Sequence, residues 1–258
     1  MGSKSLYIRA RALILAACLL GGCQDDDAPL RGMSQGETGR VVRIIDGDAL
    51  VLHTGLTVRL SGIEAPAPER RNRIGEPYAD RSARLLEDLA LGRTVRLIYP
   101  GLTRDRYDRA LAYVETADDL GPKLWLNLEM LKRGAARARL YPDTSPGGEY
   151  LLAAEADARS ANQGLWALAP YQVLPAEEIA EDARGFMIVT ATLGAKHAPQ
   201  SDRSVCRRSL LGAGLSLEIQ AGADAFCRAD APRKPARFRG YVRDGQMEIT
   251  HWMNVEPL

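Results

Sequence analysis

Four charged residues of this chain have the types and spacing that phosphate chemistry requires. Asp48 follows a short turn, Glu64 closes a predicted strand, and Arg59 and Arg109 lie within or at the start of strands. Paired carboxylates bind hard cations through oxygen, and guanidinium groups hold phosphate oxygens in a planar fork. If the fold gathers them, they form the parts of a metal-assisted phosphodiesterase. The alternative is that they are scattered on a solvated surface.

The segments that must position these residues indicate a small barrel with added helices. β-branched runs, alternation and Gly turns predict strands at 38–45, 49–53, 57–63, 94–99 and 110–114. Hydrophobic residues at helical spacing predict helices at 76–90, 124–133 and 149–162. Mostly local strand connections favour an α+β fold over a parallel sheet.

Composition limits the class of protein. The 258 residues are 46% hydrophobic and 26% charged, which is typical of one large or two small globular domains. The 34 basic and 33 acidic residues nearly cancel, which excludes a protein that coats nucleic acid by bulk charge. The apolar run nearest to membrane length is at the N-terminus, which excludes a polytopic membrane protein.

The N-terminus is typical of an export signal. Basic residues precede an apolar run at 12–20, and we predict a signal peptide at 1–22 and a flexible tether at 23–37. The segment Leu20-Gly21-Gly22-Cys23 resembles the lipobox of bacterial lipoproteins. That resemblance implies acylation of Cys23 and an exported, membrane-anchored protein on the periplasmic or outer-membrane face. The alternative is an ordinary cleaved signal.

Cys206 and Cys227 are the two cysteines that remain after the leader and Cys23. In an exported protein such a pair is most simply a disulfide. A zinc site is disfavoured, because none of the three histidines has ligand spacing to these cysteines.

Three segments, in order, resemble the thermonuclease (staphylococcal nuclease-like) family. They are Ile45-Asp46-Gly47-Asp48, the run from Val58 to Pro66, and the run from Asp105 to Tyr113. The helix ending at Gly164-Leu165-Trp166 is also similar to the family's last helix. The resemblance covers about 38–166 and implies a five-stranded OB-fold-like barrel with three helices, which we place at 38–170. It also implies Ca²⁺-dependent hydrolysis of DNA and RNA.

Residue by residue, the resemblance implies Asp48 and Glu64 as Ca²⁺ ligands, with the Ala65 carbonyl as a backbone ligand. Arg59 and Arg109 match the two arginines that hold the scissile phosphate.

Two neighbouring residues also match the family pattern. Asp46 matches an acid beside the metal ligands. Tyr107 matches a tyrosine beside the nucleotide, where it stacks on a base; the alternative is a half-buried barrel tyrosine.

The chain departs from the family at two positions. Glu64 stands where the family usually has Asp. Ala67 stands where the family has the Glu proposed to activate water, and Glu69 follows two residues later. Either the loop bulges so that Glu69 is the base, or the base is missing, at a cost of about 10²–10⁴ in rate. Two hypotheses follow: an active nuclease, or an inactive nuclease-like domain that binds nucleic acid or another ligand.

A second, smaller mostly-β domain is predicted at 185–258 from short strands and Gly-rich turns, after a helix-like linker at 171–184. This pattern of strands does not distinguish a barrel from a sandwich. Residues 184–258 hold 11 basic and 7 acidic residues. The basic cluster, Arg228, Arg233, Lys234, Arg237, Arg239 and Arg243, either follows a phosphate backbone or faces solvent, lipid or the acidic first domain. DNA or RNA as substrate and the membrane are the predicted partners; no protein partner can be inferred.

Overall fold

The structure is a computed structural model, and it describes residues 28–71, 74–197, 204–228, 230–231 and 233–258. The predicted signal peptide and Cys23 lie outside the described residues. Within the described part of the chain, no helix is long and apolar enough to cross a membrane.

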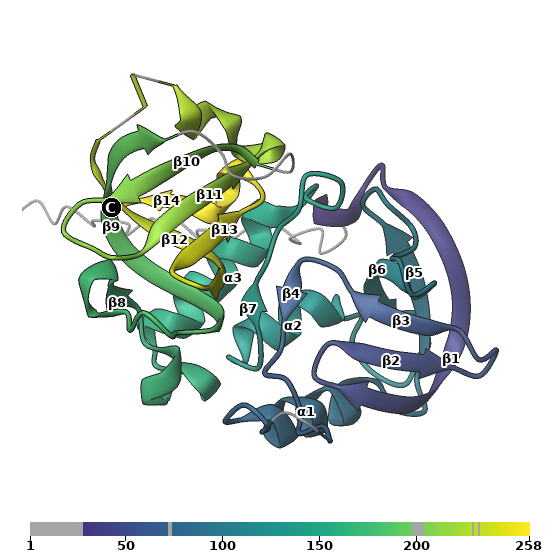
Figure 1. Ribbon diagram of the computed structural model, residues 1–258. Helices are drawn as coiled ribbons and strands as arrows, with labels where there is room; N and C mark the ends of the chain where they lie inside the picture. Colours follow the sequence, from purple (N-terminus) through teal and green to yellow (C-terminus); the bar gives the residue numbers. More distant parts are fainter. Residues whose placement is uncertain (1–27, 72–73, 198–203, 229, 232) are drawn as a thin grey trace, which may run out of the picture.

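Five strands close into the first barrel, in the order β1-β2-β3-β6-β5 (Figure 1). Their bounds are β1 Ser34–Asp46, β2 Ala49–Leu52, β3 Thr57–Leu60, β5 Thr94–Tyr99 and β6 Ala110–Thr116. β3 and β6 run parallel, and the other neighbours are antiparallel. The predicted barrel is therefore confirmed. β1 starts earlier than the predicted residue 38, because Ser34 already pairs with Tyr99.

The three predicted helices are present as α1 Ala79–Ala90, α2 Leu126–Lys132 and α3 Gly148–Ser160. α1 begins later than predicted, since Pro77 and a left-handed Tyr78 (φ 74°) precede it. It buries Ser82, Leu86 and Leu89 on one face. A short 3₁₀ turn, η1 Ala28–Leu30, places Leu30 in the core of the first barrel.

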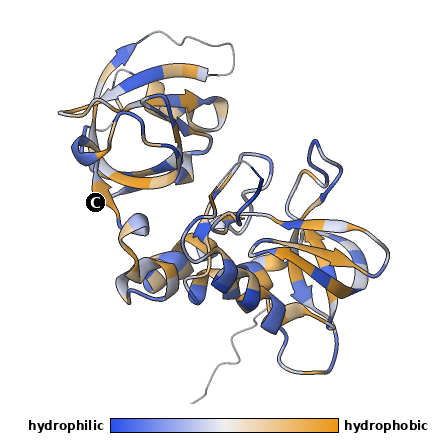
Figure 2. Ribbon diagram, turned by 60° about the horizontal axis from the view of Figure 1, so that its bottom comes forward, coloured by the Kyte–Doolittle hydropathy of each residue, from blue (hydrophilic) through white to orange (hydrophobic). Residues whose placement is uncertain are grey.

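Alternate residues of the strands fill the barrel interior with branched side chains. Figure 2 shows hydrophobic residues gathered along the strands of both barrels. A two-stranded sheet, β4 Ile63–Glu64 with β7 Arg137–Ala138, lies beside the first barrel and pairs Glu64 with Arg137. This small sheet carries residues of the candidate site.

The linker is not the helix that its sequence suggested. It contains β8 Leu174–Pro175 and η4 Ala176–Glu178, and two 3₁₀ turns, η2 Gly164–Ala167 and η3 Ala169–Tyr171, lead into it. Pro175 lacks a backbone N–H and so interrupts a helix that would run through residues 171–184. β8 instead pairs in parallel with the next strand.

The second domain is also a closed barrel. Of the two architectures that its sequence left open, a barrel and a sandwich, it has the barrel. Its strands are β9 Gly185–His197, β10 Ser204–Leu210, β11 Ser216–Gln220, β12 Pro235–Arg243, β13 Gln246–Ile249 and β14 Val255–Pro257. β9 pairs with both β10 and β12, so the ring β9-β10-β11-β13-β12 closes. The parallel pair β11–β13 corresponds to β3–β6, so the second barrel repeats the strand order of the first.

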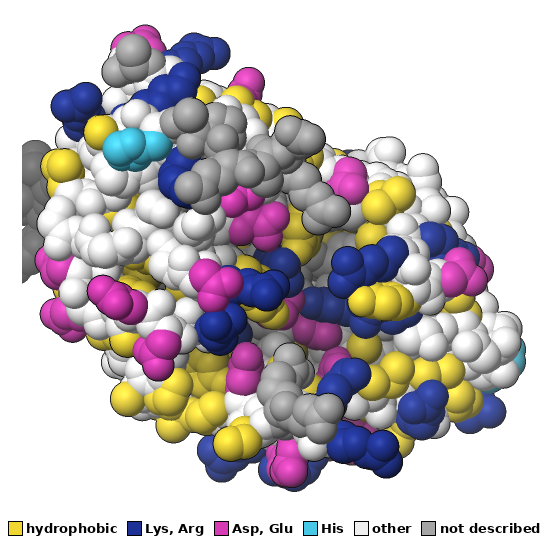
Figure 3. Space-filling view, in the orientation of Figure 1, with side chains coloured by type: hydrophobic (Ala, Val, Ile, Leu, Met, Phe, Trp, Pro, Cys, Tyr) yellow, Lys and Arg dark blue, Asp and Glu magenta, His cyan; other side chains and the backbone are white. Residues whose placement is uncertain are grey.

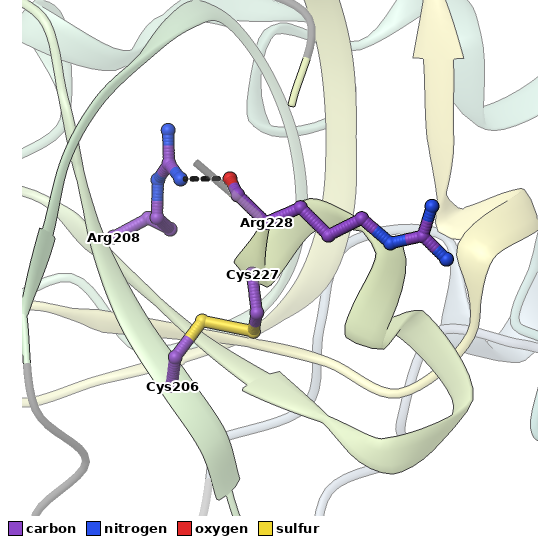
Figure 4. Close-up of a disulfide and its surroundings, with 4 residues drawn as sticks. All are labelled: Cys206, Arg208, Cys227 and Arg228. Carbon is purple, nitrogen blue, oxygen red and sulfur yellow. Dashed lines mark hydrogen bonds between the residues drawn. A yellow bond between two sulfur atoms is a disulfide. The ribbon is translucent and has the colours of Figure 1, made fainter. Parts of the chain in front are cut away.

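Cys206 on β10 and Cys227 on η5 (Ala221–Cys227) form a disulfide with Cα atoms 5.9 Å apart (Figure 4). Arg208, on the same buried face of β10 as Cys206, donates from Nη1 to the carbonyl of Arg228 at 3.1 Å. The disulfide therefore fastens the turn between β11 and β12 to the barrel wall. A last 3₁₀ turn, η6 Trp252–Asn254, precedes β14.

A buried ion cluster joins the two barrels. Glu155 on α3 is 0% exposed and pairs with Arg239 on β12, which is 1% exposed. The other oxygen of Glu155 accepts a hydrogen bond from Ala138 N at 3.0 Å. Arg237 pairs with Glu256 at 2.7 Å. Two members of the predicted basic cluster therefore have structural partners, so the six residues do not form one free basic face.

Candidate active site

Asp48 lies at the end of the tight turn between β1 and β2. It is 7% exposed, and its Oδ2 accepts a hydrogen bond from Ala65 N at 2.6 Å. A Cβ on Gly47 would lie 1.8 Å from Ser82 Oγ, so only glycine lets α1 approach this turn. The approach of α1 and the bond to Ala65 together fix Asp48.

Arg59 bridges the two predicted metal ligands. It lies on β3 opposite Ala49. Its Nη2 is 3.2 Å from Asp48 Oδ2 and 2.9 Å from Glu64 Oε2. Residues that are well separated in sequence therefore meet in one cluster, as their chemistry suggested.

Glu64 has two further partners that sequence reasoning missed. Arg139 Nη1 lies 3.1 Å from Glu64 Oε2, and the Tyr241 hydroxyl donates to Oε1 at 2.7 Å. Arg139 follows β7, which pairs with β4, whereas Tyr241 comes from β12 of the second barrel. Figure 3 shows basic and acidic side chains together in the hollow between the two barrels.

The two carboxyl groups differ in their electrostatic environment. Burial raises the pKa of Asp48 well above its ordinary value; Arg59 opposes this, while Asp46 and Glu64 add to it. Burial also acts to raise the pKa of Glu64, but Arg59 and Arg139 outweigh it, so that pKa is lowered. Asp48 is therefore the carboxyl group that a further cation would stabilise most.

Asp46 lies beside Asp48 as expected. Its Oδ1 accepts a hydrogen bond from Asp48 N at 3.2 Å. Its other oxygen is 3.8 Å from the exposed Arg70. It therefore supports the turn that carries Asp48.

Arg109 is held by Asp105 in the loop before β6. Arg109 Nε and Nη2 each lie 2.7 Å from Asp105 Oδ2, and the backbone N–H of Arg109 donates to Oδ1 at 3.0 Å. Arg109 and Arg59 line the same cavity of about 510 Å³. The structure thus brings the two arginines to one cavity from different strands.

Tyr107 lines that cavity and is 66% exposed. The guanidinium groups of Arg106 and Arg109 lie 4.8 and 5.7 Å from its ring centre. It is not the half-buried barrel residue of the alternative interpretation, and its ring is open to a stacking partner.

The backbone of Ala67 is hydrogen-bonded to Glu76. Ala67 N donates to Glu76 Oε2 at 3.1 Å, and Glu76 N donates to Ala67 O at 2.8 Å. Glu69 is exposed and makes no hydrogen bond or ion pair with the described residues. The sequence offered no signal for Glu76, because its return to Ala67 depends on the loop between them.

The donor set fits a hard divalent cation. Asp48 and Glu64 carry oxygen atoms of the kind that such cations prefer, and their side chains meet in one cluster around Arg59. The described part of the chain contains no group of three or more His, Cys, Asp or Glu that could hold a metal. Asp48 and Glu64 are the two side chains that would hold such a cation, with backbone carbonyl or water oxygens completing the coordination.

Comparison with known proteins finds several that are similar to the first barrel and the helices around it. Residues 57–168 match the family described as "Staphylococcal nuclease homologue". The thermonuclease of Staphylococcus intermedius is 29% identical over 146 residues, which is 54% of this chain and 84% of that protein. The thermonuclease of Staphylococcus hyicus is 29% identical over 133 residues, 50% of this chain and 76% of that protein. "Probable endonuclease LCL3" of Verticillium alfalfae is 32% identical over 133 residues, 50% of this chain and 45% of that protein.

Proposed function

Because the first barrel is a thermonuclease-like domain, we propose that this chain is a Ca²⁺-dependent nuclease that hydrolyses phosphodiester bonds of DNA or RNA. The observation that supports this most is the shared cavity of Arg59 and Arg109, next to the Asp48–Arg59–Glu64 cluster. That arrangement combines a phosphate clamp with paired carboxylates.

Arg59 and Arg109 hold the oxygens of the scissile phosphate in this proposal. Their planar forks stabilise the negative charge that builds on the phosphate in the transition state. Asp105 orients Arg109 through three contacts. Tyr107 offers its exposed ring to a neighbouring base.

Asp48 and Glu64 hold the Ca²⁺ ion. When bound, the ion supplies positive charge that polarises a phosphoryl oxygen. Asp46 keeps Asp48 in place through the backbone of the turn. Arg59, which contacts both ligands, couples the metal ligands to the phosphate clamp.

Glu69 is the proposed general base, following the loop-bulge hypothesis. The competing function is a non-catalytic module that binds nucleic acid or another ligand. Two observations favour that alternative: Ala67 carries no carboxylate, and both oxygens of Glu64 already have partners. A cleavage assay distinguishes the two functions, because only a nuclease cuts the nucleic acid that it binds.

The test is digestion of a fluorescein-labelled single-stranded DNA oligonucleotide, and its RNA counterpart, by the purified full chain. We expect cleavage with Ca²⁺ and none with chelator. Asp48→Asn should abolish cleavage. Asp118→Asn is the matched control, because Asp118 also pairs with an arginine, Arg93, but lies outside the site. Binding without cleavage would instead establish the binding module.

We also propose that the chain is exported and anchored by lipid at Cys23. The basic and apolar leader and the segment Leu20-Gly21-Gly22-Cys23 support this. Mass spectrometry of the protein from bacterial membranes should find a mature chain that begins with acylated Cys23. A free N-terminus at Gln24 or later would contradict it.

A further inference from the structure

The second barrel reaches into the candidate active site through one side chain. The hydroxyl of Tyr241, on β12, donates to Glu64 Oε1 at 2.7 Å. A cavity of about 580 Å³ next to this contact is lined from both barrels, by Arg106 and Arg139 on one side and by residues including Tyr241 and Glu248 on the other. Arg106 and Arg139 also line the cavity of the phosphate clamp.

The position of Tyr241 is fixed by its surroundings. The guanidinium of Arg139 lies 4.3 Å from the centre of its ring, and the ring of Phe186 meets it edge-on with centroids 6.0 Å apart. Two residues earlier on the same strand, Arg239 is held by the buried Glu155. The hydroxyl is therefore placed by the fold of the second barrel.

Tyr241 completes the restraint of the Glu64 carboxylate. Arg59 and Arg139 both bind Oε2, which leaves Oε1 to Tyr241. With partners on both oxygens, the carboxylate cannot rotate about its last bond without losing a contact. A glutamate has one more rotatable bond than the aspartate that the resembled family usually has at this position. Holding its carboxylate in one orientation therefore depends more on such contacts.

We propose that Tyr241 is a positioning residue of the phosphodiesterase site, acting through Glu64, and that the second barrel is thereby part of that site. This inference rests on the proposed nuclease function. Tyr241 orients the carboxylate and does not contact the phosphate. Arg59, Arg109 and Tyr107 remain the substrate contacts.

The test is Tyr241→Phe in the full chain, assayed on the single-stranded DNA oligonucleotide with Ca²⁺. The variant keeps the ring that packs against Arg139 and removes only the hydroxyl. We expect kcat to fall about tenfold, the scale of one hydrogen bond to a charged group, with KM within about twofold. Tyr99→Phe is the matched control: its hydroxyl also donates to a glutamate, Glu37, and neither residue lines the cavity of the phosphate clamp. It should retain the wild-type kcat even if its melting temperature falls.

A second variant pair tests whether Tyr241 acts through Glu64. Glu64→Asp shortens the side chain by one methylene and withdraws the carboxylate from the hydroxyl. In that background, Tyr241→Phe should change kcat less than about twofold, because the contact is already lost.

Each outcome has a definite meaning. A tenfold loss in the wild-type background that disappears in the Glu64→Asp background supports the inference. Unchanged kcat in Tyr241→Phe, or an equal loss in both backgrounds, overturns it while the nuclease function stands. A wild-type chain that cleaves no oligonucleotide overturns the proposed function, and this inference with it.

Discussion

Arg109 illustrates how the fold orients a single side chain for its proposed role. Asp105 fixes both its backbone and its guanidinium, and the pKa of Asp105 is lowered because hydrogen bonds from Arg109 and Tyr107 outweigh the effect of burial. The side chain remains 34% exposed at the cavity. It is therefore oriented before substrate arrives, which is the condition for transition-state stabilisation without reorganisation.

Arg109→Lys should lower kcat by about 10²-fold, because lysine keeps the charge and loses the fork. Oligonucleotide cleavage with Ca²⁺ measures this. Arg96→Lys is the control, since Arg96 is exposed on β5 and outside the cavity. Wild-type kcat in Arg109→Lys would show that this guanidinium does not hold the reacting phosphate.

Substitutions near Ala67 test which residue, if any, acts as the general base. Glu69→Gln should lower kcat by about 10²–10⁴ and leave oligonucleotide binding intact, because a base acts in the transition state. Glu76→Gln is the comparison, since Glu76 contacts the Ala67 backbone and Arg137. A loss in Glu76→Gln alone would move the base to Glu76. A gain in Ala67→Glu, with no loss in either glutamine variant, would show that the natural chain lacks a base.

At the scale of elements, the turn between β1 and β2 depends on the close approach of α1. A Cβ at residue 47 would lie 1.8 Å from Ser82 Oγ and 2.8 Å from Ala65 Cβ. Ser82 is buried and its hydroxyl donates to Ala135 O at 2.7 Å, so it has little freedom to move. The helix, the turn with Asp48 and the loop with Ala65 therefore form one packed unit.

Gly47→Ala should destabilise the chain by about 1–3 kcal/mol, the usual cost of overpacking, and lower nuclease activity as well. Urea unfolding and the cleavage assay measure the two effects. Gly214→Ala is the control, because a Cβ there meets nothing within 4 Å. Equal stability of the two variants would mean that α1 is not pressed against the turn.

At the scale of the whole molecule, the site lies where two barrels of the same strand order meet. α3 of the first barrel carries Glu155, which binds Arg239 of the second barrel and Ala138 N of its own. Arg159, one turn later on α3, contacts both Glu155 and Glu256 at 3.4 Å. The interface that places Tyr241 on Glu64 is thus held by buried charges.

Arg239→Met should destabilise the chain by about 3 kcal/mol, because it leaves a buried carboxylate with weaker partners. Arg184→Ala removes an ion pair with Asp244 in which both side chains are over 60% exposed, and should cost less than about 1 kcal/mol. Urea unfolding distinguishes them. Similar midpoints for the two variants would show that the inter-barrel cluster contributes little.

Features that depend on local pattern could be predicted from the residues alone. Alternation and turns predicted the strands of the first barrel, because neighbouring strands there follow one another along the chain. Asp48 and Arg59 lie on this run of hairpins and Glu64 directly follows it, but the pattern left open whether the three side chains meet, and the structure shows that they do. The sequence of β10 does not look like a half-buried strand, because a charged residue, Arg208, occupies one of its buried positions.

Contacts between segments distant in sequence could be seen only in the folded chain. Arg139 reaches Glu64 because β7 pairs with β4, and Tyr241 reaches it because the second barrel docks against the first. Glu76 returns to Ala67 through a loop with no regular pattern. Side-chain periodicity describes which face of a strand or helix is buried and carries no information about which distant element covers that face. The contacts of Arg139 and Tyr241 with Glu64 could therefore not be predicted from the sequence.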